Sequence, residues 1–300
     1  MKSFCVALCL LSAVIARCGP ASGQDTLQVG KAIIHIESGP DLPLPPPLIM
    51  EWVRRAAVAV TNYLGCYPVK TLYIGIHAGG GQPVSGGVTH GASRIDVRLG
   101  PDAQAEDLRG DWILTHEMFH LAFPTLKQRY LWMMEGLSDY LEPVARARAG
   151  QLTARDVWRE FVEGLPQGLP AADEHGLDYS SSRERVYWGG NLFWLLADVQ
   201  IRVRTGNRHS VDDAIRAILK AGGNGDASWS IERVIRVGDT ATGTTVLKDL
   251  YGEIGLHRGD IQLGSLWQAL GVVYRHRAVR FDDSAPWAAF RVAITARTQH

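Results

Sequence analysis

The chain has 300 residues, 46% of them hydrophobic, with 31 basic and 31 acidic side chains. Such a length suits one large domain or two small ones. The balanced charge gives no indication of binding to nucleic acid or to an acidic membrane surface. The sequence contains no P-loop and no Gly-x-Gly-x-x-Gly motif, so it predicts no nucleotide-binding site.

Residues 1–23 have the features of a secretory signal peptide. Lys2 gives a positive start, Phe4–Ala16 is apolar, and small residues lead to a cleavage site after Gly23. The apolar run is shorter than the ~20 residues that a membrane-spanning helix needs. We therefore expect an exported protein, periplasmic or secreted, without a membrane anchor after signal cleavage. The other cysteines leave with the signal, so we expect Cys66 to be unpaired and buried as a small apolar residue.

The next part of the chain predicts a small mixed sheet with one covering helix. Apolar residues alternate, or run together, as in strands over 27–37, 69–77 and 94–99. A helical pattern at 49–64 follows a proline-rich turn that is unsuited to a helix interior. A glycine-rich segment at 84–93 precedes the last of these strands.

The clearest chemical motif follows this sheet. His116, Glu117 and His120 form a His-Glu-x-x-His pattern in an expected helix. Side chains four residues apart share one helix face, so both histidines can bind a single zinc ion. Glu117 is then placed to reach a metal-bound water as general base. Two histidines at this spacing can also arise by chance.

A second expected helix supplies a third ligand. A catalytic zinc usually takes three protein ligands and leaves the fourth position to water, and Glu135 is a carboxylate in the right neighbourhood. Asp139, one turn further, is placed to accept the other ring N–H of a zinc-binding histidine. The sequence therefore predicts one zinc ion per chain, held by His116, His120 and Glu135.

The remainder of the chain predicts mainly helices. Pro143 is expected to kink the second helix or end it early, although that helix can otherwise run to Arg148. A stretch at 164–182, rich in Gly, Pro and Ser, is expected to be a surface loop. Helices are expected at 154–163, 186–205, 211–221, 231–237, 244–254 and 261–270, and extended segments at 272–279 and 290–294.

These motifs resemble the gluzincin metallopeptidases, in which His-Glu-x-x-His is followed by a helix bearing Glu. The chain looks most similar to the glycyl aminopeptidase family, whose members often carry a PDZ domain, and more distantly to the aminopeptidase N and leukotriene-hydrolase group. Residues 132–140 are similar to the family segment Trp-x-x-Glu-Gly-Phe-x-x-Tyr, and 187–190 resemble its later Tyr-x-x-Gly. The resemblance covers roughly residues 70–255, and no PDZ domain is recognisable after Gly271.

The resemblance implies an α+β fold with a thermolysin-like catalytic arrangement. We divide the chain into the signal peptide (1–23), an N-terminal α/β part that ends in the zinc helix (24–123) and a mainly helical C-terminal part (124–300). The small N-terminal mixed sheet and the helical part would enclose the zinc cleft between them.

The resemblance also implies roles for residues outside the zinc motifs. Tyr187 would donate its hydroxyl to the oxyanion, with a packed core tyrosine as the alternative. The glycine-rich segment would form a strand edge that binds substrate backbone, with an ordinary hairpin as the alternative. In relatives this segment carries a Glu that holds the substrate's free amine, whereas this chain has Gly86, Gly87, Thr89 and His90 there.

We therefore expect an exported zinc metallopeptidase that acts on peptide or protein substrates. Because Thr89 is uncharged, strict aminopeptidase specificity is expected to be weak, unless Asp173 or Glu174 supplies an acid from a loop. Two alternatives stay open: a zinc-containing binding module with little hydrolysis, and a hydrolase of a non-peptide bond on the same scaffold. The sequence makes no prediction of oligomeric state.

Overall fold

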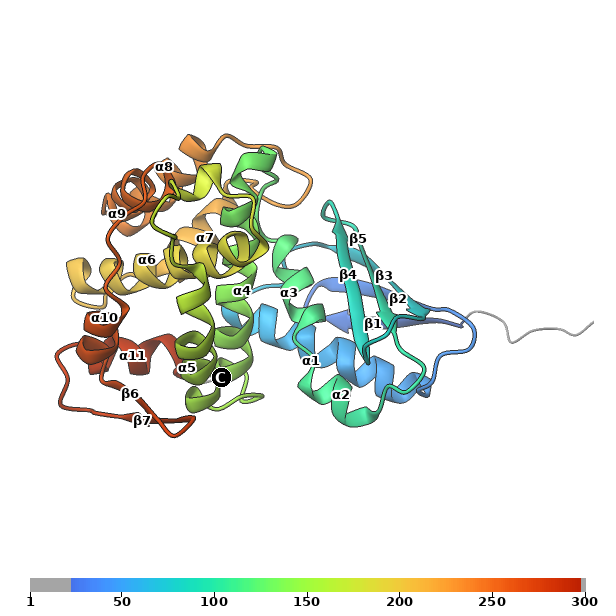
Figure 1. Cartoon of the computed structure of the whole chain (residues 1–300). Coiled ribbons are helices and arrows are strands. Elements are labelled where there is room, and N and C mark those ends of the chain that lie inside the picture. The colour runs from blue at the N-terminus through green and yellow to red at the C-terminus, as the bar shows by residue number, and fades with distance from the viewer. Residues whose placement is uncertain (1–22, 298–300) are drawn as a thin grey trace, which may run out of the picture.

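The structure is a computed structural model that describes residues 23–297. A five-stranded mixed sheet forms the N-terminal part and helices form most of the C-terminal part, as predicted (Figure 1). The predicted signal peptide lies outside the described residues, apart from Gly23, where the first strand begins. None of the helices described has the length and apolar character needed to cross a membrane.

The sheet has the strand order β1-β2-β3-β5-β4, in which β2, β3 and β5 are parallel and the two outer strands are antiparallel to their neighbours. The prediction of one strand over 27–37 was wrong, because Gly30, at φ 58°, turns the chain into a hairpin. The strands are β1 (Gly23–Val29), β2 (Ala32–Ser38), β3 (Thr71–Ala78), β4 (Val84–His90) and β5 (Arg94–Leu99).

Helix α1 (Pro46–Leu64) packs beside the sheet and also contacts both zinc-motif helices. Its apolar face, which includes Trp52 and Val60, is buried in the core that these elements share. The helix ends at Gly65, which adopts the left-handed conformation that glycine tolerates best. Cys66 comes directly after this cap and is exposed, so the prediction of a buried cysteine was wrong. Past the cap, the residue no longer belongs to the core-facing stripe of the helix.

The helical part packs around the helix that carries Glu135. Its last segment also contains a short hairpin, β6 (Val272–Arg275) and β7 (Ala278–Phe281). The helices are α2 (Ala105–Gly110), α3 (Ile113–His120), α4 (Leu131–Arg148), α5 (Ala154–Gly164), α6 (Gly190–Thr205), α7 (Val211–Lys220), α8 (Ile231–Thr242), α9 (Val246–Leu250), α10 (Leu263–Leu270) and α11 (Ala288–Thr295).

Pro143 does not end α4 early, and the helix continues to Arg148, the farther of the two ends that the sequence left open. The proline removes one helical hydrogen bond, but its neighbours Leu141 and Val144 are buried, and this tertiary packing holds the helix together. Residues 290–294 lie in α11 and are not extended. So short an apolar run does not separate strand from helix by its periodicity.

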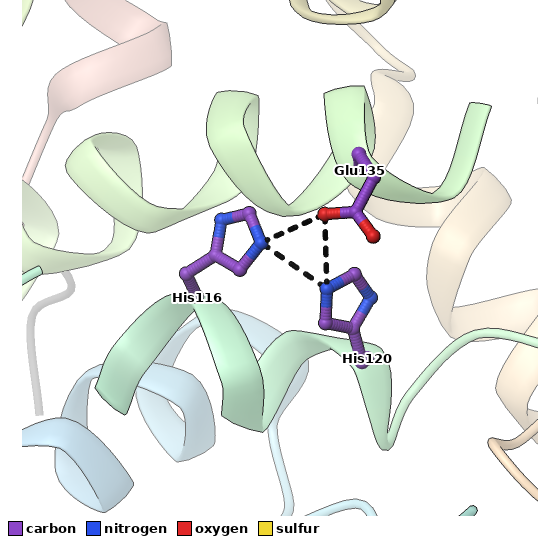
Figure 2. Close-up of side chains that lie close together, drawn as sticks. All are labelled: His116, His120 and Glu135. Atoms are coloured by element: carbon purple, nitrogen blue, oxygen red, sulfur yellow. Dashed lines mark hydrogen bonds and ion pairs between the residues drawn. The ribbon is translucent and has the colours of Figure 1, made fainter. Parts of the chain in front are cut away.

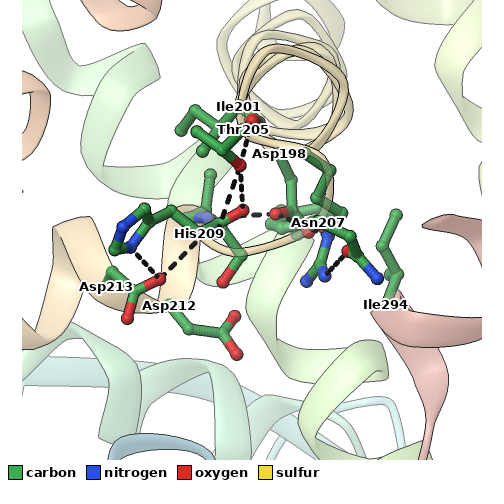
Figure 3. A network of polar contacts seen from close by, with 12 residues as sticks. Asp198, Ile201, Thr205, Asn207, His209, Asp212, Asp213 and Ile294 are labelled. Carbon is green, nitrogen blue, oxygen red and sulfur yellow. Dashed lines mark hydrogen bonds and ion pairs between the residues drawn. The ribbon is translucent and has the colours of Figure 1, made fainter. Parts of the chain in front are cut away.

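A buried polar network fixes α4 relative to α1, α6 and α7. Asp198 on α6 accepts hydrogen bonds from the Tyr140 hydroxyl at 2.6 Å and from the Val211 backbone N–H at 3.0 Å. Asp212 on α7 accepts one from the Tyr63 hydroxyl at 2.6 Å. Figure 3 shows both carboxylates between neighbouring helices. Because a buried carboxylate without partners is costly, these contacts hold α4, and with it the third predicted zinc ligand, in place.

Candidate zinc site and substrate cleft

Helices α3 and α4 bring the three predicted zinc ligands together (Figure 2). The Nε2 atom of His116 lies 3.1 Å from Nε2 of His120 and 3.2 Å from Oε2 of Glu135. His120 Nε2 lies 3.5 Å from the same carboxylate oxygen. Ligand atoms placed tetrahedrally at about 2.0–2.1 Å from a zinc ion lie about 3.3 Å from one another. The three donor atoms therefore have the spacing that one zinc ion requires.

The charges of this cluster also favour a cation. Burial opposes protonation of His116, but Asp139 and Glu135 outweigh it and raise the pKa of this imidazole to about 10. Burial likewise opposes ionisation of Glu135, yet its contacts with the two histidines hold the pKa of the carboxyl well below its usual range. Two anionic groups thus surround two imidazoles, and a divalent cation fits this donor set better than a proton does.

The second ring nitrogen of each histidine also has a partner on α4. Nδ1 of His116 lies 2.9 Å from Oδ1 of Asp139, the position predicted for this carboxylate. Nδ1 of His120 lies 3.3 Å from the hydroxyl oxygen of Ser138. Ser138 is not among the predicted site residues, although its place beside Asp139 on the same helix could have indicated it. Such partners set the orientation of metal-binding imidazoles.

Glu117 lies between the zinc ligands and strand β4. Its Oε2 accepts a hydrogen bond from the Thr89 hydroxyl at 2.7 Å, and the same hydroxyl lies 2.9 Å from the Glu117 backbone oxygen. A Cβ at Gly87 would lie 2.8 Å from Oε1 of Glu117 and 2.5 Å from a methyl carbon of Ile113. Glycine is therefore needed at position 87 because the strand packs directly on α3. The strand therefore approaches the zinc helix closely at this position.

Strand β4 is an edge strand and also one arm of a hairpin with β5, and that its edge binds substrate backbone stays a prediction. The pairing register shifts between Ser85 and Val88, and Gly86 between them has φ 61°. His90 points elsewhere: its Nε2 lies 3.2 Å from Oδ2 of Asp96, and the residue does not line the cleft.

A π-helical turn, Arg185–Gly189, precedes α6 and places Tyr187 in the cleft. The ring stacks on the His116 imidazole with 6.3 Å between centroids. Burial, together with the charges of Glu135 and Asp139, raises the pKa of the Tyr187 hydroxyl to about 12. The hydroxyl is therefore a proton donor at neutral pH. Its partial exposure to the cleft argues against the core-packing alternative.

Two cavities meet at this site. The zinc cleft, of about 890 Å³, contains the predicted ligands and Glu117 and is bordered by β4. A second cavity, of about 1070 Å³, extends over α4 and α5, and the two share Trp112, Arg183 and Tyr187. Apart from Glu117 and Glu135, the described residues that line the zinc cleft include no carboxylate. Glu174, predicted as a possible amine anchor, lies outside the cleft and pairs with Arg185 at 3.6 Å.

Comparison with known proteins supports the metallopeptidase prediction at the level of fold. No family model matches the chain, and no curated protein matches its sequence. The structure is similar to an aminopeptidase N family protein from Idiomarina loihiensis, with a TM-score of 0.68 and 13% identity over 84% of this chain and 50% of the other. It is also similar to an M1 zinc metallopeptidase from Deinococcus radiodurans, with a TM-score of 0.51 and 15% identity over 80% and 52% of the two chains.

A variant of the Deinococcus radiodurans enzyme bound to a Tyr-Ser-Ala substrate matches with a TM-score of 0.51 and 13% identity. The chain spans about half the length of these solved proteins. It therefore shares the mixed α+β fold of M1 peptidase domains, in which a sheet-containing part precedes a helical part. At such low identity the likeness establishes the fold alone.

Proposed function

We propose that this protein is an aminopeptidase-like zinc metallopeptidase that hydrolyses peptide bonds. The supporting observation is the convergence of His116, His120 and Glu135 at the spacing of zinc ligands, with Glu117 beside them in the same cleft. The fold shared with M1 zinc metallopeptidases favours a gluzincin with a thermolysin-like catalytic arrangement. On its sequence motifs, we place it near the glycyl aminopeptidase family.

The chain's own residues divide the work of hydrolysis. His116, His120 and Glu135 would hold one zinc ion, which when bound supplies Lewis acidity and acidifies the attacking water. Glu117 takes the proton from that water and later delivers it to the leaving amine. Tyr187, whose pKa is raised to about 12, donates its hydroxyl to the developing oxyanion.

The cleft favours peptides that do not need a free N-terminus. An ammonium group binds best to a carboxylate, and the zinc cleft offers none among its described lining residues beyond Glu117 and Glu135, both assigned to the chemistry. The hydroxyl of Thr89 is already engaged by Glu117. We therefore propose that internal or N-terminally blocked bonds are cut at least as well as terminal ones.

Neither alternative function gains support from the site. A binding module held together by zinc has no use for a carboxylate hydrogen-bonded beside the ligands, as Glu117 is. A substrate without peptide groups would leave the edge of β4, which borders the cleft, without a partner. We also propose that the protein acts after export, in a periplasm or outside the cell, as the composition of residues 1–23 indicates.

The test is cleavage of an unbiased peptide library by purified, zinc-loaded protein, followed by mass spectrometry. Wild type is expected to cut internal bonds. Glu117→Gln is expected to keep its zinc and lose turnover by about 10²–10⁴-fold. Glu253→Gln serves as the matched control, since Glu253 is exposed and does not line the cleft. A zinc-loaded wild type that cuts no peptide, or an active Glu117→Gln variant, would contradict the proposal.

A further inference from the structure

We infer that Thr89 is a positioning residue for Glu117, and that its hydroxyl holds the carboxylate in the orientation from which it takes a proton. This inference rests on the proposed function, because it assigns Thr89 a role toward the general base. The resemblance predicts that Thr89 belongs to the substrate-binding segment. The structure instead puts its hydroxyl 2.7 Å from Oε2 of Glu117.

The fold determines this contact through the register of β4. Side chains alternate along a strand, so Gly87 and Thr89 share the face toward α3, while Val88 between them is 49% exposed. Thr89 is paired with Ile95 of β5, after the register shift at Gly86. A strand without this shift would present the opposite residues to the zinc helix.

The chemistry of the contact suits a general base. A hydroxyl has one hydrogen, and a hydrogen bond to an ionised carboxylate is about twice as strong as a neutral one. Among the described residues, the Thr89 hydroxyl is the side-chain donor to this carboxylate. When Oε2 is held in this way, Oε1 stays available to accept the proton of water. The branched Thr89 side chain is restricted at χ1, which limits its movement.

Packing around the contact leaves Glu117 little freedom. The carboxylate approaches the backbone of Gly87 so closely that a Cβ there would lie 2.8 Å from Oε1. The Thr89 hydroxyl oxygen also lies 2.9 Å from the Glu117 backbone oxygen, so the strand approaches the same helical residue closely. Strand β4 therefore encloses the base on one side, and Thr89 provides the directional part of this enclosure.

The kinetic test uses the zinc-loaded full-length protein and the best peptide from the library. Thr89→Val keeps the shape of the side chain but removes its hydroxyl. We expect kcat to fall about 10–10²-fold, because part of the general-base contribution is lost. KM is expected to stay within about 2-fold of the wild-type value. Thr89→Ser is expected to restore most of kcat. Thr26→Val is the matched control, because Thr26 is an exposed threonine on β1. A normal kcat in Thr89→Val, or a loss confined to KM, would overturn the inference.

A second measurement needs no turnover. The unfolding free energies of Thr89→Val, Glu117→Ala and the double variant form a double-mutant cycle, and we expect clearly non-additive losses. Additive losses would overturn the contact. The two measurements separate the peptidase function from the role of Thr89. An inactive wild type whose Thr89 and Glu117 are energetically coupled would refute the peptidase function alone. An active wild type in which the two residues are not coupled would refute the role of Thr89 alone.

Discussion

Gly136 on α4 and Gly190 on α6 lie so close together that neither position has room for a side chain. A Cβ at Gly136 would lie 2.1 Å from the carbonyl carbon of Gly190, and one at Gly190 would lie 1.9 Å from the backbone oxygen of Trp132. Glu135 immediately precedes the first glycine, and Tyr187 precedes the second by one turn. The helix crossing therefore sets the distance between the third predicted zinc ligand and the predicted oxyanion donor.

Substituting Gly136 tests this relationship. Gly136→Ala is expected to destabilise the protein by about 1–3 kcal/mol, the usual cost of overpacking, and to weaken zinc binding by displacing Glu135. Denaturant unfolding and zinc titration measure the two effects. Gly264→Ala is the control, because a Cβ in that helical position would have open space around it. Normal stability and normal zinc affinity in Gly136→Ala would contradict the importance of the crossing.

Zinc content provides a direct test of the ligand set. Wild type is expected to hold one zinc ion per chain after dialysis, and His116→Ala or His120→Ala to lose it, since two ligands seldom retain a catalytic zinc. Elemental analysis gives the stoichiometry. His77→Ala is the matched control, because His77 pairs with Asp96 on the sheet. Stoichiometric zinc in His116→Ala would exclude the assignment.

The convergence of the three candidate zinc ligands could be predicted because it follows from patterns within single helices. His116 and His120 share a helix face because they are four residues apart, and Glu135 and Asp139 share a face of the next helix for the same reason. The strongly patterned elements, including α1 and α5, were also predicted close to their observed bounds. In each case the sequence pattern that makes the prediction lies within a single segment.

The predictions that failed depend on contacts between segments that are distant in the sequence. Which face of β4 each residue takes depends on its register with β5, so Thr89 at Glu117 and His90 at Asp96 were not predictable from the strand itself. The exposure of Cys66 depends on the residue at which α1 ends. Packing against α10 and α4 stabilises α11 as a helix, and the local sequence lacks that information.

Tyr187→Phe separates the oxyanion role from core packing. Turnover is expected to fall about 10²–10³-fold, the loss typical of one oxyanion donor, while thermal stability changes little because the hydroxyl is in the cleft. Steady-state kinetics and a melting curve are the measurements. Tyr179→Phe is the control, as Tyr179 is 68% exposed. A change confined to the melting temperature would favour a packing role for Tyr187.

Two carboxyls in the second cavity should make stability depend on pH. Burial, then the charges of Glu142 and Asp139, raise the pKa of Glu160 to about 8, and burial raises that of Glu142 to about 7. The unfolded chain titrates these groups near pH 4.5, so between that pH and about 8 the folded state binds more protons. The stabilising contribution of the two carboxyls is therefore fully present below about pH 4.5, their pKa in the unfolded chain, and is lost as the pH rises from there to about 8.

Glu160→Gln removes one of these ionisations. Near pH 9 the melting temperature of the variant is expected to exceed that of wild type by about 2–4 °C for each kcal/mol of unfolding free energy recovered. Near pH 5 the two melting temperatures are expected to differ little. Melting curves across this range are the measurement, with Glu253→Gln as the exposed control. An equal shift at both pH values would point to packing and not to the charge of Glu160.

The last prediction concerns the end of the peptide. Matched fluorogenic peptides with free and acetylated N-termini are expected to be cut at rates within about tenfold, because no further carboxylate among the described residues lines the zinc cleft to bind the ammonium. A strong preference for the free amine would contradict this.

Thr89→Glu makes the test sharper. A glutamate there brings a second negative charge beside Glu117, whose Oε2 now accepts from Thr89 at 2.7 Å. Repulsion between the two carboxylates should displace the base. We therefore expect Thr89→Glu to lower turnover of both peptides, and a selective gain on the free-amine peptide would show that position 89 faces the substrate instead.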